Sequence, residues 1–222
     1  MFDASRFSKR RSGIVLRQRL RVLSKEVFRK SIHLCSAFIP FFLSKAYVPV
    51  MILLGAAMVL YSVSEFVRLS GKEVFLISAI TEAAARKRDE NRFVLGPVTL
   101  TAGIMTASLL WQPLPAAIGI YALAFGDGLA SLSGKLFGRV QIPCTEGKTA
   151  AGSLTCFGAI FTATYLALCF SPAASGCPDI ALVALKIATA GMLIEVLPLR
   201  DLDNIVIPVV LGGLAQLQLF AM

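Results

Sequence analysis

A single aspartate inside an apolar stretch is the most informative residue of the chain. Asp127 lies in ALAFGDGLASLSGKLFGR, between Gly126 and Gly128. If this stretch is helical, Asp127, Ser131 and Lys135 share one face, because they follow one another at intervals of four residues. A helix that serves only for packing gains nothing from a buried carboxylate, so we interpret Asp127 as a functional residue.

The stretch TEGKTAAGS resembles the end of a nucleotide-binding P-loop but does not complete it. The Walker A pattern requires a glycine where this chain has Ile142. Lys148 and Thr149 nevertheless precede an apolar run, and Gly152 and Ser153 make its first turn small and rich in hydroxyls. Exposed backbone N–H groups at such a helix start attract anions, so we expect a phosphate site here.

Oxygen-bearing side chains gather in the short stretch EVLPLRDLDN. Glu195 precedes the turn, and Asp203 and Asn204 follow it. Asp203 or Asn204 can be a simple N-cap, and Glu195 can pair with Arg200. Together with Asp127, however, Glu195 and Asp203 would form the all-oxygen type of site that Mg²⁺ prefers, and we favour that reading.

The composition shows which elements must position these residues. Hydrophobic residues make up 56% of the chain and charged residues 16%, and the mean hydropathy is +0.75. Soluble domains average roughly 45–50% apolar and about 25% charged residues, so the chain is expected to be an all-α, polytopic membrane bundle. About seven spans are predicted, at 31–44, 47–67, 94–111, 114–137, 149–170, 179–198 and 204–221. The expected division is a basic interfacial arm, 1–26, and a membrane-embedded catalytic domain, 27–222.

Basic residues predict the orientation of these spans. Residues 1–30 contain ten Lys and Arg against two acids, which places the N-terminus in the cytoplasm. The arm is expected to bind anionic lipid headgroups, and no nucleic acid. On this topology, one set of ionisable residues falls at the cytoplasmic ends of the spans: Arg29, Lys30, His33, Glu65, Arg68, Asp127, Lys135, Lys148, Glu195 and Asp203. Of the ionisable residues in or beside spans, Lys186 alone falls elsewhere, so we expect one anion-binding pocket that opens to the cytoplasm.

Four motifs in order resemble the CTP-dependent membrane kinase family of dolichol kinase, phytol kinase and fungal-type diacylglycerol kinase. They are RKSIHL, GDGLASLSGKLFGR, EGKTAAGS and EVLPLRDLDNIVIP, and the similar region covers about residues 27–210. Lys148–Thr149 stands where the family usually has Lys-Ser, which keeps the hydroxyl. The family is distantly related to the phosphatidate cytidylyltransferases.

The resemblance implies transfer of the γ-phosphate of CTP to the hydroxyl of a lipid alcohol, with Mg²⁺ or Ca²⁺. Residues expected to bind the nucleotide and its phosphates are Arg29, Lys30, Gly134, Lys135, Arg139, Lys148, Thr149, Gly152, Ser153 and Asn204. Asp127, Glu195 and Asp203 are the expected metal ligands. Asp127, Lys148 and His33 are the expected catalytic residues, and either Asp127 or His33 can be the general base.

Two other functions stay open on the sequence. A phosphatidate cytidylyltransferase would use the same nucleotide, metal and membrane face, but its C-terminal motif of paired acids with His and Gly is missing, since His33 is the only histidine. A transporter would need polar groups through to the outer side. The expected location is the inner membrane of a bacterium, with the site facing the cytoplasm. The acceptor can be a polyprenol, a phytol-like alcohol or diacylglycerol, and the oligomeric state stays open.

Overall fold

The described part of the chain is helical, as predicted. The computed structural model describes residues 24–71, 92–143, 145, 147–177 and 179–220. Within these ranges, every regular element is a helix, apart from an isolated bridge between Gln141 and Thr149. Most of the predicted basic arm, and hence the predicted lipid-headgroup contact, lies outside the described residues.

The helices follow one another with short connections. The first covers residues 24–35, and the others are η1 (Ser36–Phe38), α2 (Ile39–Lys45), α3 (Tyr47–Leu69), α5 (Gly96–Leu110), α6 (Pro113–Tyr121), η3 (Ala122–Asp127), α7 (Gly128–Phe137), α8 (Ala150–Cys169), η4 (Pro172–Ala174), α9 (Ile180–Val196), η5 (Arg200–Leu202) and α10 (Asp203–Phe220).

Four helical segments are long and apolar enough to cross a membrane. They are Tyr47–Leu69, Pro113–Phe137, Ala150–Cys169 and Arg200–Phe220. Their bounds agree within a few residues with four of the predicted spans. The protein is therefore an integral membrane protein by length and composition of its helices.

The three other predicted segments are helical but shorter. The first, 31–44, is divided among helix 24–35, η1 and α2. The 15 residues of α5 and the 17 residues of α9 extend roughly 22 and 25 Å, below the roughly 30 Å of a hydrocarbon core. Seven spans and a cytoplasmic N-terminus thus remain predictions.

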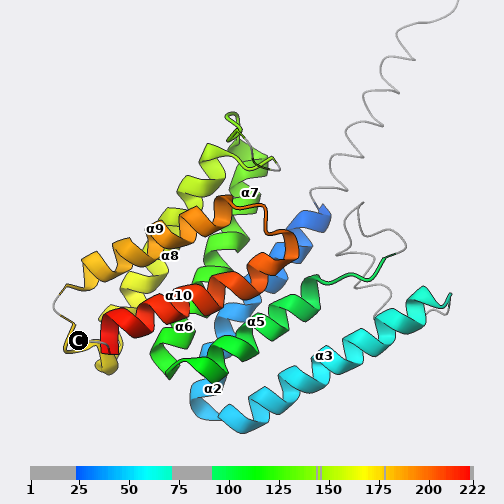
Figure 1. The fold of residues 1–222 in the computed structure, drawn as a ribbon, viewed down its shortest axis with the longest axis horizontal. Coiled ribbons are helices and arrows are strands. Elements are labelled where there is room, and N and C mark those ends of the chain that lie inside the picture. Colours follow the sequence, from blue (N-terminus) through cyan, green and yellow to red (C-terminus); the bar gives the residue numbers. More distant parts are fainter. Residues whose placement is uncertain (1–23, 72–91, 144, 146, 178, 221–222) are drawn as a thin grey trace, which may run out of the picture.

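The continuous segment from α6 through η3 to α7 is the central helix of the bundle. Within its membrane-length window 67% of the residues are buried, compared with 17% for α3, which lies at one edge outside α5 (Figure 1). Asp127 ends η3, so the carboxylate is carried by the most enclosed segment. The apolar side chains of α3 face outwards instead, as expected for a lipid-facing helix.

Close backbone contacts bring α10 against α5 and α6. A Cβ atom on Gly103 of α5 would overlap the backbone carbonyl of Asn204, and one on Gly119 of α6 would overlap that of Pro208. Both glycines are needed because the helix backbones touch here. The start of α10 is thereby held beside α5, next to the central helix.

Candidate active site

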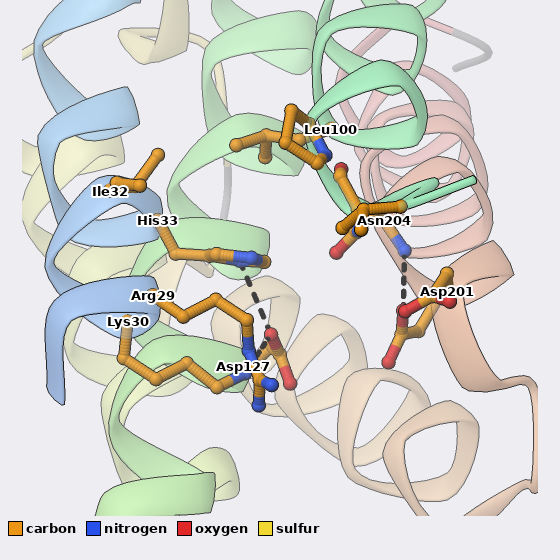
Figure 2. A pocket seen from close by; sticks show the side chains of 12 residues that line it. Arg29, Lys30, Ile32, His33, Leu100, Asp127, Asp201 and Asn204 are labelled. Carbon is orange, nitrogen blue, oxygen red and sulfur yellow. Dashed lines mark hydrogen bonds and ion pairs between the residues drawn. The ribbon is translucent and has the colours of Figure 1, made fainter. Parts of the chain in front are cut away.

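The Asp127 carboxylate is bound by two side chains from helix 24–35. Lys30 Nζ donates a hydrogen bond of 2.5 Å to Asp127 Oδ2, and His33 Nδ1 lies 3.2 Å from the same oxygen. All three residues are buried, with exposed fractions of 3% for Lys30, 6% for His33 and 7% for Asp127. A carboxylate, an ammonium and an imidazole are thus enclosed together (Figure 2).

Small residues on both sides of Asp127 let neighbouring helices approach it. A Cβ on Gly126 would lie 2.7 Å from Ile160 Cγ1 of α8, and one on Gly128 would lie 3.4 Å from Leu34 Cδ2 of helix 24–35. Asp127 also follows the π-helical turn η3, a local widening that often occurs at functional sites. The glycines flanking Asp127 therefore serve the packing that encloses it.

A pocket with an empty volume of about 550 Å³ lies in front of this group. It is lined by Arg29, Lys30, Ile32, His33, Val94, Gly96, Pro97, Leu100, Asp127, Asp201, Asp203 and Asn204. In Figure 2, Arg29, Lys30 and Asp127 lie at one end, Ile32 and Leu100 at the other, and Asp201 and Asn204 face them from across the pocket. The pocket therefore joins a charged region to an apolar one.

The tight turn between α9 and α10 forms the acidic wall. Arg200 has a φ of 56°, a left-handed conformation that is uncommon for a residue other than glycine, and it reverses the chain before Asp201 and Asp203. Asn204 Nδ2 donates a hydrogen bond of 2.9 Å to Thr99 Oγ1 of α5. The turn thus reaches the pocket because α10 is anchored on α5.

Glu65 anchors the pocket wall that precedes α5. Its side chain is fully buried near the end of α3, accepts a hydrogen bond of 2.9 Å from the Val94 N–H and forms an ion pair of 2.7 Å with Arg68. Tyr61 adds a hydrogen bond of 3.1 Å to the Val94 carbonyl. Glu65 and Arg68 lie at the predicted end of their helix, and they hold Val94 in the pocket wall.

A second polar group forms around Glu195. Lys148 Nζ lies 2.9 Å from Glu195 Oε1 and donates a hydrogen bond of 2.5 Å to its backbone carbonyl, and Ser153 Oγ donates one of 3.1 Å to Oε2. The charge of Lys148 acts on both Asp127 and Asp203, so this group adjoins the pocket. Lys148 belongs to a small antiparallel turn in which its carbonyl accepts from Ile142 N at 2.9 Å.

Three residues that we expected to bind phosphate have packing or capping roles in this structure. Thr149 is the N-cap of α8, and its hydroxyl accepts a hydrogen bond of 3.2 Å from Gly152 N. A Cβ on Gly134 would lie 2.8 Å from that hydroxyl, and one on Gly152 would lie 3.0 Å from the Ala130 carbonyl. These contacts join α7 to α8, and a phosphate-binding role for them remains a prediction.

Lys135 and Ser131 bind a glutamate that the sequence analysis assigned to the arm. Glu26 accepts hydrogen bonds from Ser131, at 2.5 Å, and from Lys135, and it pairs with Arg29 at 2.5 Å. Burial alone raises the pKa of the Glu26 carboxyl, but the Arg29 charge and the hydrogen bonds from Lys135 and Ser131 outweigh it and lower the pKa from 4.5 to about 2. The packed part of the chain thus includes Glu26, which the division at residue 26 leaves in the arm. Arg139 is exposed after α7.

The three predicted metal ligands do not form one cluster. Asp127 and Asp203 line the pocket, whereas Glu195 is bound by Lys148 and Ser153 beside it. Within the described ranges, no three His, Cys, Asp or Glu side chains lie close enough together to hold a metal ion. A metal role therefore remains a prediction.

Two residues of this region, Glu26 and Asp201, were not among the predicted site residues. Glu26 could have been found from its spacing, because Glu26, Arg29, Lys30 and His33 share one helix face at i, i+3, i+4 and i+7. Asp201 carries no comparable signal, since a turn has no helical periodicity.

Curated relatives of the chain are plant kinases of prenyl alcohols. It is 29% identical over 140 residues to the probable phytol kinase 1 of Oryza sativa subsp. japonica, covering 59% of this chain and 44% of the relative. It is 28% identical over 142 residues to the farnesol kinase of Arabidopsis thaliana, covering 61% and 46%. The chain thus spans less than half the length of the curated relatives it matches. No protein-family model and no solved structure matches it. The chain is a distant homologue of the plant phytol and farnesol kinases.

Proposed function

We propose that the protein is a membrane kinase that transfers the γ-phosphate of CTP to the hydroxyl of a lipid alcohol at the cytoplasmic face. The distant homology to phytol and farnesol kinases supports a kinase with a prenol or similar acceptor. The observation that carries the proposal is the buried Lys30–Asp127–His33 group, in a pocket that is charged at one end and apolar at the other. A lipid alcohol has the same two-part character.

Cations at the charged end are suited to bind the triphosphate. Arg29 and Lys30 line the pocket, and the Lys148 charge acts on it from the Glu195 side. Phosphoryl transfer depends mainly on positioning and on neutralising the charge of the transferred group, so cations at fixed positions are the chief requirement. In this proposal Glu195 holds Lys148 in place for the phosphates.

The alcohol lies with its chain along Ile32 and Leu100 and its hydroxyl at His33. Its oxygen forms the new bond to the γ-phosphorus, the bond from that phosphorus to the bridging oxygen breaks, and CDP leaves. His33 takes the hydroxyl proton, while Asp127 orients the imidazole through Nδ1. We favour His33 over Asp127 as the base because Asp127 already accepts a hydrogen bond from the Lys30 ammonium.

The acidic wall fits a cation that is bound mainly through the substrate. Asp203 and Asp201 line the pocket opposite Lys30, and Mg²⁺ is commonly held by one or two carboxylates plus substrate phosphates. When bound, Mg²⁺ would neutralise charge on the phosphate oxygens. Asp203, with Asp127 nearby, is the residue that we propose for this role.

A double-label transfer assay tests the proposal. The purified chain in mixed micelles receives CTP labelled at the γ- or at the α-phosphate, with farnesol, phytol, a polyprenol, diacylglycerol or phosphatidic acid. We expect γ-label alone to enter an organic-phase product, from one or more of the alcohols, and Asp127→Asn to abolish the transfer. ATP labelled at the γ-phosphate, in parallel, measures the selectivity for the base.

Two outcomes would contradict the proposal. Transfer of α-label to phosphatidic acid only would identify a cytidylyltransferase. No transfer of either label, with the wild type equal to Asp127→Asn, would indicate a non-enzymatic membrane protein.

A further inference from the structure

Glu26 is a buried carboxylate with three partners, and the proposed mechanism does not use it. It is 5% exposed, and its two oxygens receive Arg29 and Ser131 on one side and Lys135 on the other. Among the described residues that line the pocket, Arg29 is present and Glu26 is not. Glu26 therefore touches a pocket residue from behind.

The contacts set the register of two antiparallel helix faces. Helix 24–35 presents Glu26 and then Lys30, while the central helix presents Lys135 and Ser131 opposite Glu26, and Asp127 opposite Lys30. In both helices the spacing is four residues, about one turn. A shift at Glu26 would therefore move Lys30 relative to Asp127 as well.

Glu26 stays charged under all conditions in which such a protein works. Its pKa of about 2 lies far below neutrality. An ionised carboxylate holds Arg29 and Lys135 by charge-assisted hydrogen bonds, which are the stronger and more directional kind. The anchor therefore does not depend on pH in the working range.

We propose that Glu26 is a positioning residue, which holds the Arg29 guanidinium and the register of helix 24–35 so that Arg29 and Lys30 meet a polyphosphate in the pocket. This inference rests on the proposed function, because it concerns the phosphate subsite of that pocket. Its ligand class is an inorganic or nucleoside triphosphate.

The test uses the full chain in detergent with Glu26→Gln, which keeps the shape of the side chain and removes its charge. Ser131→Ala removes one donor to Glu26 and is a milder second variant. Asp179→Asn is the matched control, because Asp179 is an exposed N-cap at the far end of α9. Two quantities are measured: the affinity for inorganic tripolyphosphate with Mg²⁺, and separate KM values for CTP and the alcohol.

We expect Glu26→Gln to weaken tripolyphosphate binding about tenfold and Ser131→Ala about threefold. The KM for CTP should rise by similar factors, while the KM for the alcohol and the values of Asp179→Asn stay at the wild-type level. A purely structural role would lower the folded fraction, and hence kcat, without changing either KM or the affinity.

Unchanged affinity in both folded variants would overturn the inference, as would a wild type that does not bind tripolyphosphate. If Glu26→Gln does not fold, Ser131→Ala decides by the same criterion. A wild type that binds tripolyphosphate but transfers no phosphate would refute the proposed function alone, and the inference would still be judged by the titration.

Discussion

The buried Lys30–Asp127 pair allows a double-mutant cycle that separates stability from catalysis. Its atoms are 2.5 Å apart, and the two side chains are 3% and 10% exposed. Removing one partner of a buried pair leaves the other charge uncompensated, at a cost of roughly 3–5 kcal/mol. Asparagine and glutamine keep the shape and some hydrogen bonding, so we expect about 3 kcal/mol for each single variant, Asp127→Asn and Lys30→Gln.

The double variant should cost far less than the sum of the two. Without either charge, a glutamine amide can donate to an asparagine oxygen, so we expect a total of about 3 kcal/mol and a coupling energy of similar size. Phosphoryl transfer should nevertheless stay abolished, because the carboxylate and the ammonium are both missing.

Unfolding in mixed micelles of increasing SDS content measures these free energies. Trp111 is the only tryptophan and reports on the fold, since its Nε1 donates a hydrogen bond of 2.9 Å to the Val209 carbonyl. Lys186→Gln is the control, because Lys186 makes an exposed hydrogen bond to Gln218 and should cost under about 0.5 kcal/mol. A double variant that is destabilised by about 6 kcal/mol, the additive sum, would refute a coupled buried pair, and so would single variants within about 1 kcal/mol of wild type.

Three further predictions follow from individual contacts. The folded pKa of Glu26 lies below its ordinary value of 4.5, so its stabilisation should be complete above about pH 4.5 and be lost as the pH falls towards 2, at most about 3 kcal/mol before solvent screening; Glu26→Gln should flatten this part of an unfolding-versus-pH curve. Gly119→Ala would push a methyl group into the Pro208 carbonyl and should cost about 1–3 kcal/mol in the SDS titration, whereas Gly158→Ala, with open space around it, should be neutral or stabilising. His33→Gln should lower kcat by roughly 10²–10⁴ with the KM for CTP nearly unchanged in steady-state kinetics, and an unchanged kcat would exclude His33 as the base.

The chemistry around Asp127 was largely readable from helical periodicity. The predicted face of Asp127, Ser131 and Lys135 is confirmed, since all three contact helix 24–35. The motif RKSIHL was expected beside them, and Lys30 and His33 do bind Asp127. Local spacing succeeds here because both faces belong to regular helices.

The motif TEGKTAAGS shows where such reading ends. Its lysine and hydroxyls were expected to await phosphate, but Lys148 and Ser153 bind Glu195, and Thr149 caps its own helix. A polar side chain at a helix start suits an anion, a carboxylate or the backbone equally well. The choice among them depends on which other helix arrives there.

The sequence by itself determined the helical class, four membrane-length segments and the residues able to do chemistry. Apolar length and a period near four residues are local properties, and lipid leaves the backbone no alternative to helices or closed barrels. Only the tertiary structure decided the pairing: Lys30 with Asp127 across 97 positions, and Glu26 with Ser131 and Lys135 across 105 and 109. Such partners depend on the register between helices, which is set by close contacts such as those of Gly103 and Gly128.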